Sequence, residues 1–130
     1  MASTKLGYFK EETVATTIHD HLLQLSGVSF MDAAKAPVIG FYRKDQRYKF
    51  ATLHGGSLQS LILHVDPGHP NSTIGRQKQI DAQTRLDFDI RKLRKHKLKR
   101  HEVYLPLEKF DLEKMEELIN YAYHKQTKLD

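Results

Sequence analysis

The chain has 130 residues, of which 39% are hydrophobic and 28% are charged, and it contains no cysteine. A chain of this size and composition is expected to fold as one domain, residues 1–130, around a single hydrophobic core. The lack of cysteine excludes disulfides, thiolate metal sites and thiol nucleophiles. Residues 1–10 are expected to form a flexible N-terminal tail. Since no apolar run is long enough for a signal peptide or a membrane span, the sequence predicts a cytoplasmic protein without membrane contact.

The first predicted element is a helix over residues 11–25. Apolar residues recur from Val14 to Leu25 at spacings of four, four and three, which places them on one face of a helix. Ser26 and Gly27 follow directly, and a glycine at this position typically ends a helix.

Residues 36–66 change to β-branched and aromatic composition. They predict three strands, near 38–42, 48–53 and 61–65. The glycines at 55–56 tolerate positive φ and suit a tight turn between the second and third strands. We therefore expect three antiparallel strands in meander order.

A loop is predicted over residues 66–73, which are rich in proline, glycine and polar residues. Residues 74–84 are polar and are expected to form only a helical turn or two. Alternation of apolar and charged residues then predicts a strand over 85–91. A second alternation over 103–107 predicts another strand, which Pro106 places at a sheet edge or a strand end.

The last predicted element is a helix that begins after Asp111, a plausible N-cap residue. Its apolar face runs from Leu112 to Tyr123, and glutamates occupy the other side. Helices at both ends of a block of antiparallel strands indicate an α+β fold. We expect two layers, with a sheet of about five strands packed on one face by the N- and C-terminal helices.

Positive charge is concentrated between the predicted fourth and fifth strands. Residues 91–100 contain seven Lys or Arg and no acidic residue, and residues 74–101 have a net charge of +7, whereas the whole chain has +5. Such a cluster attracts polyanions because neutralised phosphates release condensed counterions. The residues expected to contact nucleic acid are Arg85, Arg91, Lys92, Arg94, Lys95, Lys97, Lys99 and Arg100. Arg76 and Lys78 lie nearby in the sequence.

Two other interpretations of this cluster remain open. The cations could pair with the acidic face of the C-terminal helix, which carries Glu113, Glu116 and Glu117; exposed ion pairs contribute only about 0–1 kcal/mol each. The alternative function is a protein-interaction module or homodimeric adaptor, in which the basic segment of one copy docks on an acidic surface of another. A small-molecule pocket between the helices and the sheet is a third option.

Several short strings along the chain carry a family resemblance. They are residues 25–28 after the first helix, 37–41 with 48–53 as a strand, turn and strand, 64–67 before the loop, and 103–105 before the closing helix. Together they resemble the YjbR/MmcQ-like family of the wider YdhG/YjbR/CyaY-like fold. Ser26 replaces the proline of the family pattern, and the tryptophan that precedes its closing strand is absent. The resemblance implies an α+β fold. Because some members of the family are described as DNA-binding, it also implies nucleic-acid binding.

Other candidate sites are weaker. His54, His64 and His69 are expected to lie near one another if the strands pair in order, but their spacing is not typical of a zinc or iron site, so no metal or cofactor is predicted. The chain has no nucleophile elbow, phosphate-binding glycine loop or paired-carboxylate signature, so no enzymatic activity is predicted. The aromatic residues Phe41, Tyr42, Tyr48 and Phe50 favour core and edge packing over base stacking.

Overall fold

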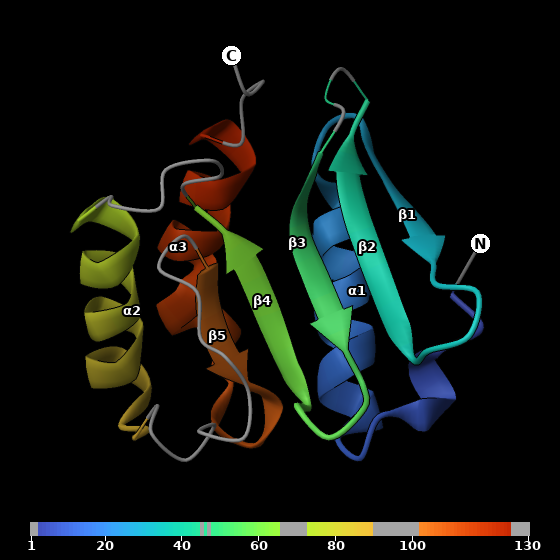
Figure 1. Ribbon diagram of the computed structural model, residues 1–130, viewed down its shortest axis with the longest axis horizontal. Coiled ribbons are helices and arrows are strands. Elements are labelled where there is room, and N and C mark those ends of the chain that lie inside the picture. Colours follow the sequence, from blue (N-terminus) through green and yellow to red (C-terminus); the bar gives the residue numbers. More distant parts are fainter. Residues whose placement is uncertain (1–2, 45, 47, 66–72, 90–101, 126–130) are drawn as a thin grey trace.

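The computed structural model describes residues 3–44, 46, 48–65, 73–89 and 102–125. They form two layers, a five-stranded antiparallel sheet and the N- and C-terminal helices that cover one of its faces, and the middle helix lies beside the last strand (Figure 1). The strands are β1 (Val28–Asp32), β2 (Val38–Arg43), β3 (Lys49–His54), β4 (Ser60–His64) and β5 (Glu102–Pro106), and they lie in this order across the sheet. The helices are α1 (Glu12–Gln24), α2 (Thr73–Leu86) and α3 (Leu112–Lys125), with short 3-10 turns at η1 (Leu6–Tyr8) and η3 (Leu107–Lys109). The predicted α+β class, with an antiparallel sheet and terminal helices, is confirmed.

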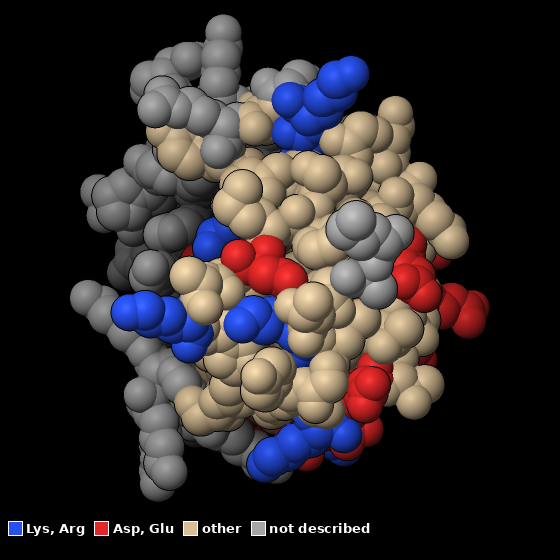
Figure 2. All heavy atoms as spheres, turned by 90° about the vertical axis from the view of Figure 1, so that its right-hand side faces the viewer, with Lys and Arg blue, Asp and Glu red and all other residues tan. Residues whose placement is uncertain are grey.

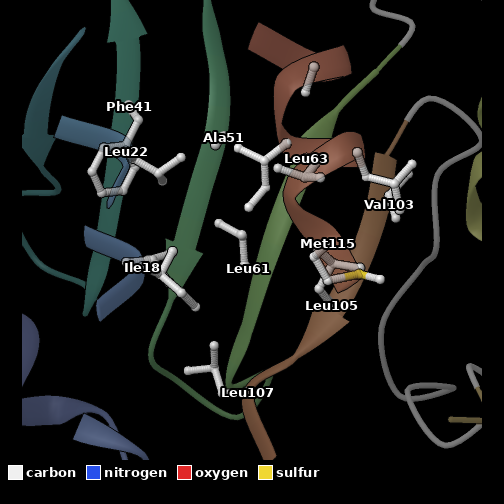
Figure 3. Packing of buried hydrophobic residues seen from close by; sticks show 14 of the residues in the cluster. Ile18, Leu22, Phe41, Ala51, Leu61, Leu63, Val103, Leu105, Leu107 and Met115 are labelled. Atoms are coloured by element: carbon white, nitrogen blue, oxygen red, sulfur yellow. The ribbon is translucent and has the colours of Figure 1, made fainter. Parts of the chain in front are cut away.

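The hydrophobic core lies between the sheet and the helices α1 and α3 (Figure 3). Alternate residues of most strands point into it, as the side-chain period of a strand requires. In β3 the consecutive residues Phe50 and Ala51 both enter the core, because the register between β2 and β3 shifts there. The register aligns Phe41 of β2 with Ala51 of β3, and Ala51 with Leu63 of β4, so the core residues form rows across the sheet. The fully buried members include Ile18, Leu22, Phe41, Phe50, Leu53, Leu61, Leu63, Leu105 and Met115. Burial of each such side chain stabilises the fold by about 1.5–3 kcal/mol.

Both terminal helices form where their apolar periodicity predicts them. α1 buries Ala15, Ile18 and Leu22, and α3 buries Met115 and Ile119, each set at helical spacing. None of the helices in the described residues has an apolar stretch long enough to cross a bilayer.

The ends of these helices also agree with the sequence. α1 ends before Ser26 and Gly27, as predicted, and its cap residue Leu25 is extended. Gly27 has φ of +70° in the turn that follows, where the Val28 N–H donates to the Leu25 carbonyl oxygen at 3.2 Å. At the start of α3, the backbone N–H of Lys114 donates to Oδ1 of Asp111 at 3.3 Å, so the predicted N-cap is confirmed.

The prediction of a strand over residues 85–91 is wrong, because α2 continues to Leu86. The buried residues Gln79, Ala82 and Leu86 recur at spacings of three and four, but glutamine and alanine conceal the stripe in a hydropathy pattern. Asp87 then adopts φ of +52° and turns Phe88 back toward the core. The apparent alternation of residues 86 and 88 is therefore the end of a helix.

Strand β1 was not predicted from the sequence. It lies at the sheet edge, where its burial alternates between half-buried and exposed and Met31 is 65% exposed. Only Val28 and Phe30 pack against the core, which leaves too few buried apolar residues for a period-two signal.

The expected flexible tail is also wrong for the part that the structure describes, residues 3–10. Leu6 and Phe9 are buried in the main core. The Ser3 and Thr4 hydroxyls donate to the carboxylate of Asp32 at the end of β1. These contacts attach the N-terminal segment to the sheet.

The turn between β3 and β4 forms where the glycines at 55–56 predict it, but the positive φ belongs to Gln59, at +43°. Gly55 is required for space, since a Cβ atom there would lie 3.0 Å from the Phe9 ring and 3.0 Å from the Pro37 carbonyl oxygen. The Gln59 side chain accepts from the backbone N–H of Lys10 at 3.0 Å and donates to the carbonyl oxygens of the two glycines. These bonds fix both the turn and the N-terminal segment.

Candidate functional site

Of the cations predicted to contact nucleic acid, Arg85 is the one that the structure describes. It lies in the last turn of α2, and its Nη2 atom is 3.4 Å from Oε2 of Glu117 on α3. Both side chains are substantially exposed, 36% and 76%, so solvent screens the pair strongly. The other predicted residues lie outside the described residues: Arg91, Lys92, Arg94, Lys95, Lys97, Lys99 and Arg100.

The remaining cations of α2 show how far the acidic helix α3 neutralises this region. Lys78 places its Nζ atom 4.4 Å from the centroid of the Tyr121 ring of α3, and Arg76 is exposed. On α3, Glu113 and Glu116 are exposed and form no ion pair with any residue that the structure describes. Within that part of the chain, pairing between the basic residues and the acidic helix is limited to Glu117.

The basic segment, residues 91–100, lies in the sequence between Phe88, which follows α2, and Glu102, which begins β5. Phe88 lies near Pro106, at the C-terminal end of β5, because both residues line the same two surface depressions. Glu102 begins β5 at its other end. The two flanks of the segment therefore lie at opposite ends of an edge strand.

The opposite side of the molecule has a different charge distribution. Figure 2 views the side on which β1 lies, where the coloured Lys and Arg side chains are interspersed with Asp and Glu. The described residues of this side do not form a patch of one sign.

A polar network crosses the sheet face that points away from α1 and α3. His64 of β4 pairs with Glu102 of β5, and its Nδ1 atom lies 3.3 Å from Glu102 Oε2. On the other side, His64 Nε2 lies 3.1 Å from the Thr52 hydroxyl of β3. The Tyr104 hydroxyl donates to Glu102 Oε1 at 2.5 Å, and the Gln79 amide of α2 donates to the Glu102 carbonyl oxygen at 2.5 Å. The network thus connects three strands and a helix.

The carboxylate determines the donor and acceptor roles in this network. An ionised Glu102 accepts hydrogen bonds only, so the Nδ1 atom of a neutral His64 carries the proton and donates it. The Nε2 atom is then an acceptor for the Thr52 hydroxyl. This connectivity resembles that of a nucleophile, base and acid, but Thr52 is only 4% exposed. Because a substrate could not reach this hydroxyl, we interpret the network as one that stabilises the sheet.

The network is not apparent from the sequence, because its members are far apart along the chain. The one available signal is the alternation of side chains along β4. Leu61 and Leu63 enter the core, so His64 must lie on the opposite face of the sheet. The partner of His64 follows only from the register between β4 and β5.

The expected proximity of the histidines is wrong for the two that are described. His54 pairs with Ser60 at one end of β4, whereas His64 lies at the other end. His69 lies outside the described residues. In the described ranges, no three His, Asp or Glu side chains are grouped so that they could hold a metal ion.

The four aromatic residues of β2 and β3 divide between the core and the surface. Phe41 and Phe50 are fully buried. Tyr42 is half-buried and leans over Gly40, where an added Cβ would lie 3.1 Å from its ring. Tyr48 is 39% exposed. The interpretation of core and edge packing therefore holds for the two phenylalanines.

Comparison with protein-family models, with curated proteins and with solved structures finds no match for this chain. The resemblance to the YjbR/MmcQ-like family stays a prediction.

Proposed function

We propose that the protein binds nucleic acid through phosphate contacts from the basic segment, residues 91–100. The observation that carries the proposal is the charge distribution, because residues 74–101 have a net charge of +7 in a chain of +5. Mutual repulsion among so many cations disfavours their concentration in one segment unless a polyanion compensates it.

The neighbouring contacts support this proposal. Arg85 and Lys78 are engaged by Glu117 and Tyr121 of α3, so their role is to join the two helices. Glu113 and Glu116 form no ion pair with the described residues and do not neutralise α2. Phosphate contact is therefore assigned to residues 91–100, with Arg85 at its margin.

The test is a fluorescence-anisotropy titration with labelled single-stranded and duplex DNA and RNA. The variant Arg94→Glu/Lys95→Glu/Lys97→Glu is compared with a control, Lys35→Glu/Lys109→Glu/Lys114→Glu, which changes the net charge equally at exposed positions outside the segment. We expect the first variant to lose affinity by at least about tenfold more than the control. Equal losses in both would contradict the site assignment.

The salt dependence supplies a second readout of the same titration. If four to six cations contact phosphate, log Kd against log salt should have a slope of magnitude about 3–5 for the native chain. The triple variant of the segment should reduce this slope, and the control should leave it nearly unchanged.

The alternative is self-association, and the exposed Glu113 and Glu116 of α3 favour it. These carboxylates have no ion-pair partner among the described residues and offer an acidic surface to the basic segment of a second copy. Light scattering at low and high salt separates the two functions. A salt-sensitive dimer that does not bind nucleic acid would support the alternative.

A further inference from the structure

A cavity of about 250 Å³ opens at the end of the sheet where β5 meets the turn between β3 and β4. The residues around it come from segments that are far apart in the sequence: Lys10, Glu11, Leu58, Phe88, Pro106 and Glu108. A water molecule takes about 30 Å³ of liquid volume, so the cavity has room for a molecule of roughly eight non-hydrogen atoms or slightly more. This size suits a small metabolite.

The lining of the cavity combines buried apolar residues with exposed charged ones. Leu58, Phe88 and Pro106 are buried and form the apolar part. Lys10 and Glu108 are exposed and form the charged part. An apolar surface with a few convergent polar groups is the usual composition of a small-molecule site.

The charges of the lining are not used by the fold. Glu11 occupies the N-cap position of α1, but its carboxylate makes no capping hydrogen bond. Within the described ranges, Lys10, Glu11 and Glu108 form no ion pair, with one another or with another residue. One lysine and two glutamates thus border the same cavity without pairing with one another.

The wall that carries Lys10 is fixed in place. The Gln59 side chain accepts from the Lys10 backbone N–H, and the Gln59 carbonyl oxygen accepts from the Leu107 N–H at 3.0 Å. Gln59 holds φ of +43°, a conformation that costs a non-glycine residue of the order of 1 kcal/mol. These bonds join the N-terminal segment, the turn and the end of β5 around the opening.

We propose that this cavity binds a small zwitterion with an apolar side chain, namely a free α-amino acid of about the size of leucine. The Lys10 ammonium would take the carboxylate of the ligand, Glu11 and Glu108 would take its ammonium group, and Leu58 and Phe88 would contact its side chain. None of the described residues that line the cavity is one of the cations assigned to phosphate contact, so the ligand titration tests this site separately from nucleic-acid binding.

The experiment is an NMR titration of the ¹⁵N-labelled full chain with three matched ligands. They are L-leucine, 4-methylpentanoate, which lacks the amino group, and 3-methylbutylamine, which lacks the carboxylate. We expect saturable shifts of the backbone amides of residues 57–59, 88 and 108, and a Kd for leucine about tenfold lower than for either analogue.

Two variants assign the charges, and the dispersion of the same spectra reports that each is folded. Lys10→Gln should remove the advantage of leucine over 3-methylbutylamine. Glu11→Gln/Glu108→Gln should remove the higher affinity of leucine relative to 4-methylpentanoate. The control Lys35→Gln, outside the cavity, should leave the affinity of leucine relative to both analogues unchanged. The proposal is overturned if leucine gives no saturable shifts at these amides, or if all three ligands bind equally.

Discussion

Asp32 couples the N-terminal segment to the sheet through its ionised side chain. Burial raises the pKa of this carboxyl, but hydrogen bonds from Ser3 and Thr4 and the charge of Lys5 outweigh it, so the pKa falls below its ordinary value of 3.8. A lowered pKa in the folded state adds stability above pH 3.8, and that stability is lost as the pH falls through the folded-state value.

The substitution Asp32→Asn tests this coupling. At pH 7 it should reduce the free energy of unfolding by about 1–2 kcal/mol, because hydrogen bonds to a charged group are replaced by weaker ones. Urea denaturation at several pH values checks the result. The difference from the native chain should disappear in strong acid, and a difference that persists at the lowest pH would contradict the charge-based explanation.

The contacts of His64 predict the tautomer of its neutral ring. Because Glu102 accepts from Nδ1, the neutral ring should carry its proton there and leave Nε2 to accept from Thr52. Long-range ¹H–¹⁵N NMR of the neutral histidine measures this directly. The substitution Thr52→Val should leave the Nδ1–H tautomer in place, whereas a predominant Nε2–H form in the native chain would show that the network is arranged differently.

At the scale of an element, the end of α2 is an unusual one. The Phe88 N–H donates to the Gln83 carbonyl oxygen at 3.1 Å and the Asp87 N–H donates to the Thr84 carbonyl oxygen at 3.3 Å, the pair of bonds of a Schellman motif. The left-handed position within this motif, with φ of +52°, is occupied by Asp87 where glycine is usual.

This geometry predicts different effects on stability for replacement of Asp87 by glycine and by alanine. Asp87→Gly should raise the free energy of unfolding by about 0.5–1 kcal/mol because it relieves the left-handed strain, whereas Asp87→Ala should not raise it. Chemical denaturation of both variants provides the comparison. If Asp87→Gly and Asp87→Ala change the free energy of unfolding equally, backbone strain at Asp87 does not limit the stability of α2.

At the scale of the whole molecule, the sequence predicted those elements whose apolar residues follow a clear period. α1 and α3 bury stripes at helical spacing, and β2, β3 and β4 are rich in buried β-branched and aromatic residues. α2 was shortened in the prediction because its buried stripe contains Gln79 and Ala82. β1 was missed because only two of its residues, Val28 and Phe30, pack against the core.

The candidate sites were less predictable for a related reason. The basic segment is visible in the sequence because composition can be recognised without knowing which strands pair. Its function remains a prediction. The link between His64 and Glu102 depends on the pairing of β4 with β5, and the cavity at Lys10 depends on the meeting of distant turns. Local periodicity contains no information about either.

The sheet order has a consequence for how the chain tolerates change in length. Four of the strands follow one another through short connections, and only β4 and β5 are separated by a long excursion, residues 65–101. The entropic cost of closing a long flexible loop grows logarithmically, by only about 0.6 kcal/mol for each doubling. Insertions or deletions within that excursion, outside Val65 and residues 73–89, should therefore change its length and composition at a small cost in stability, while the sheet and the terminal helices stay the same.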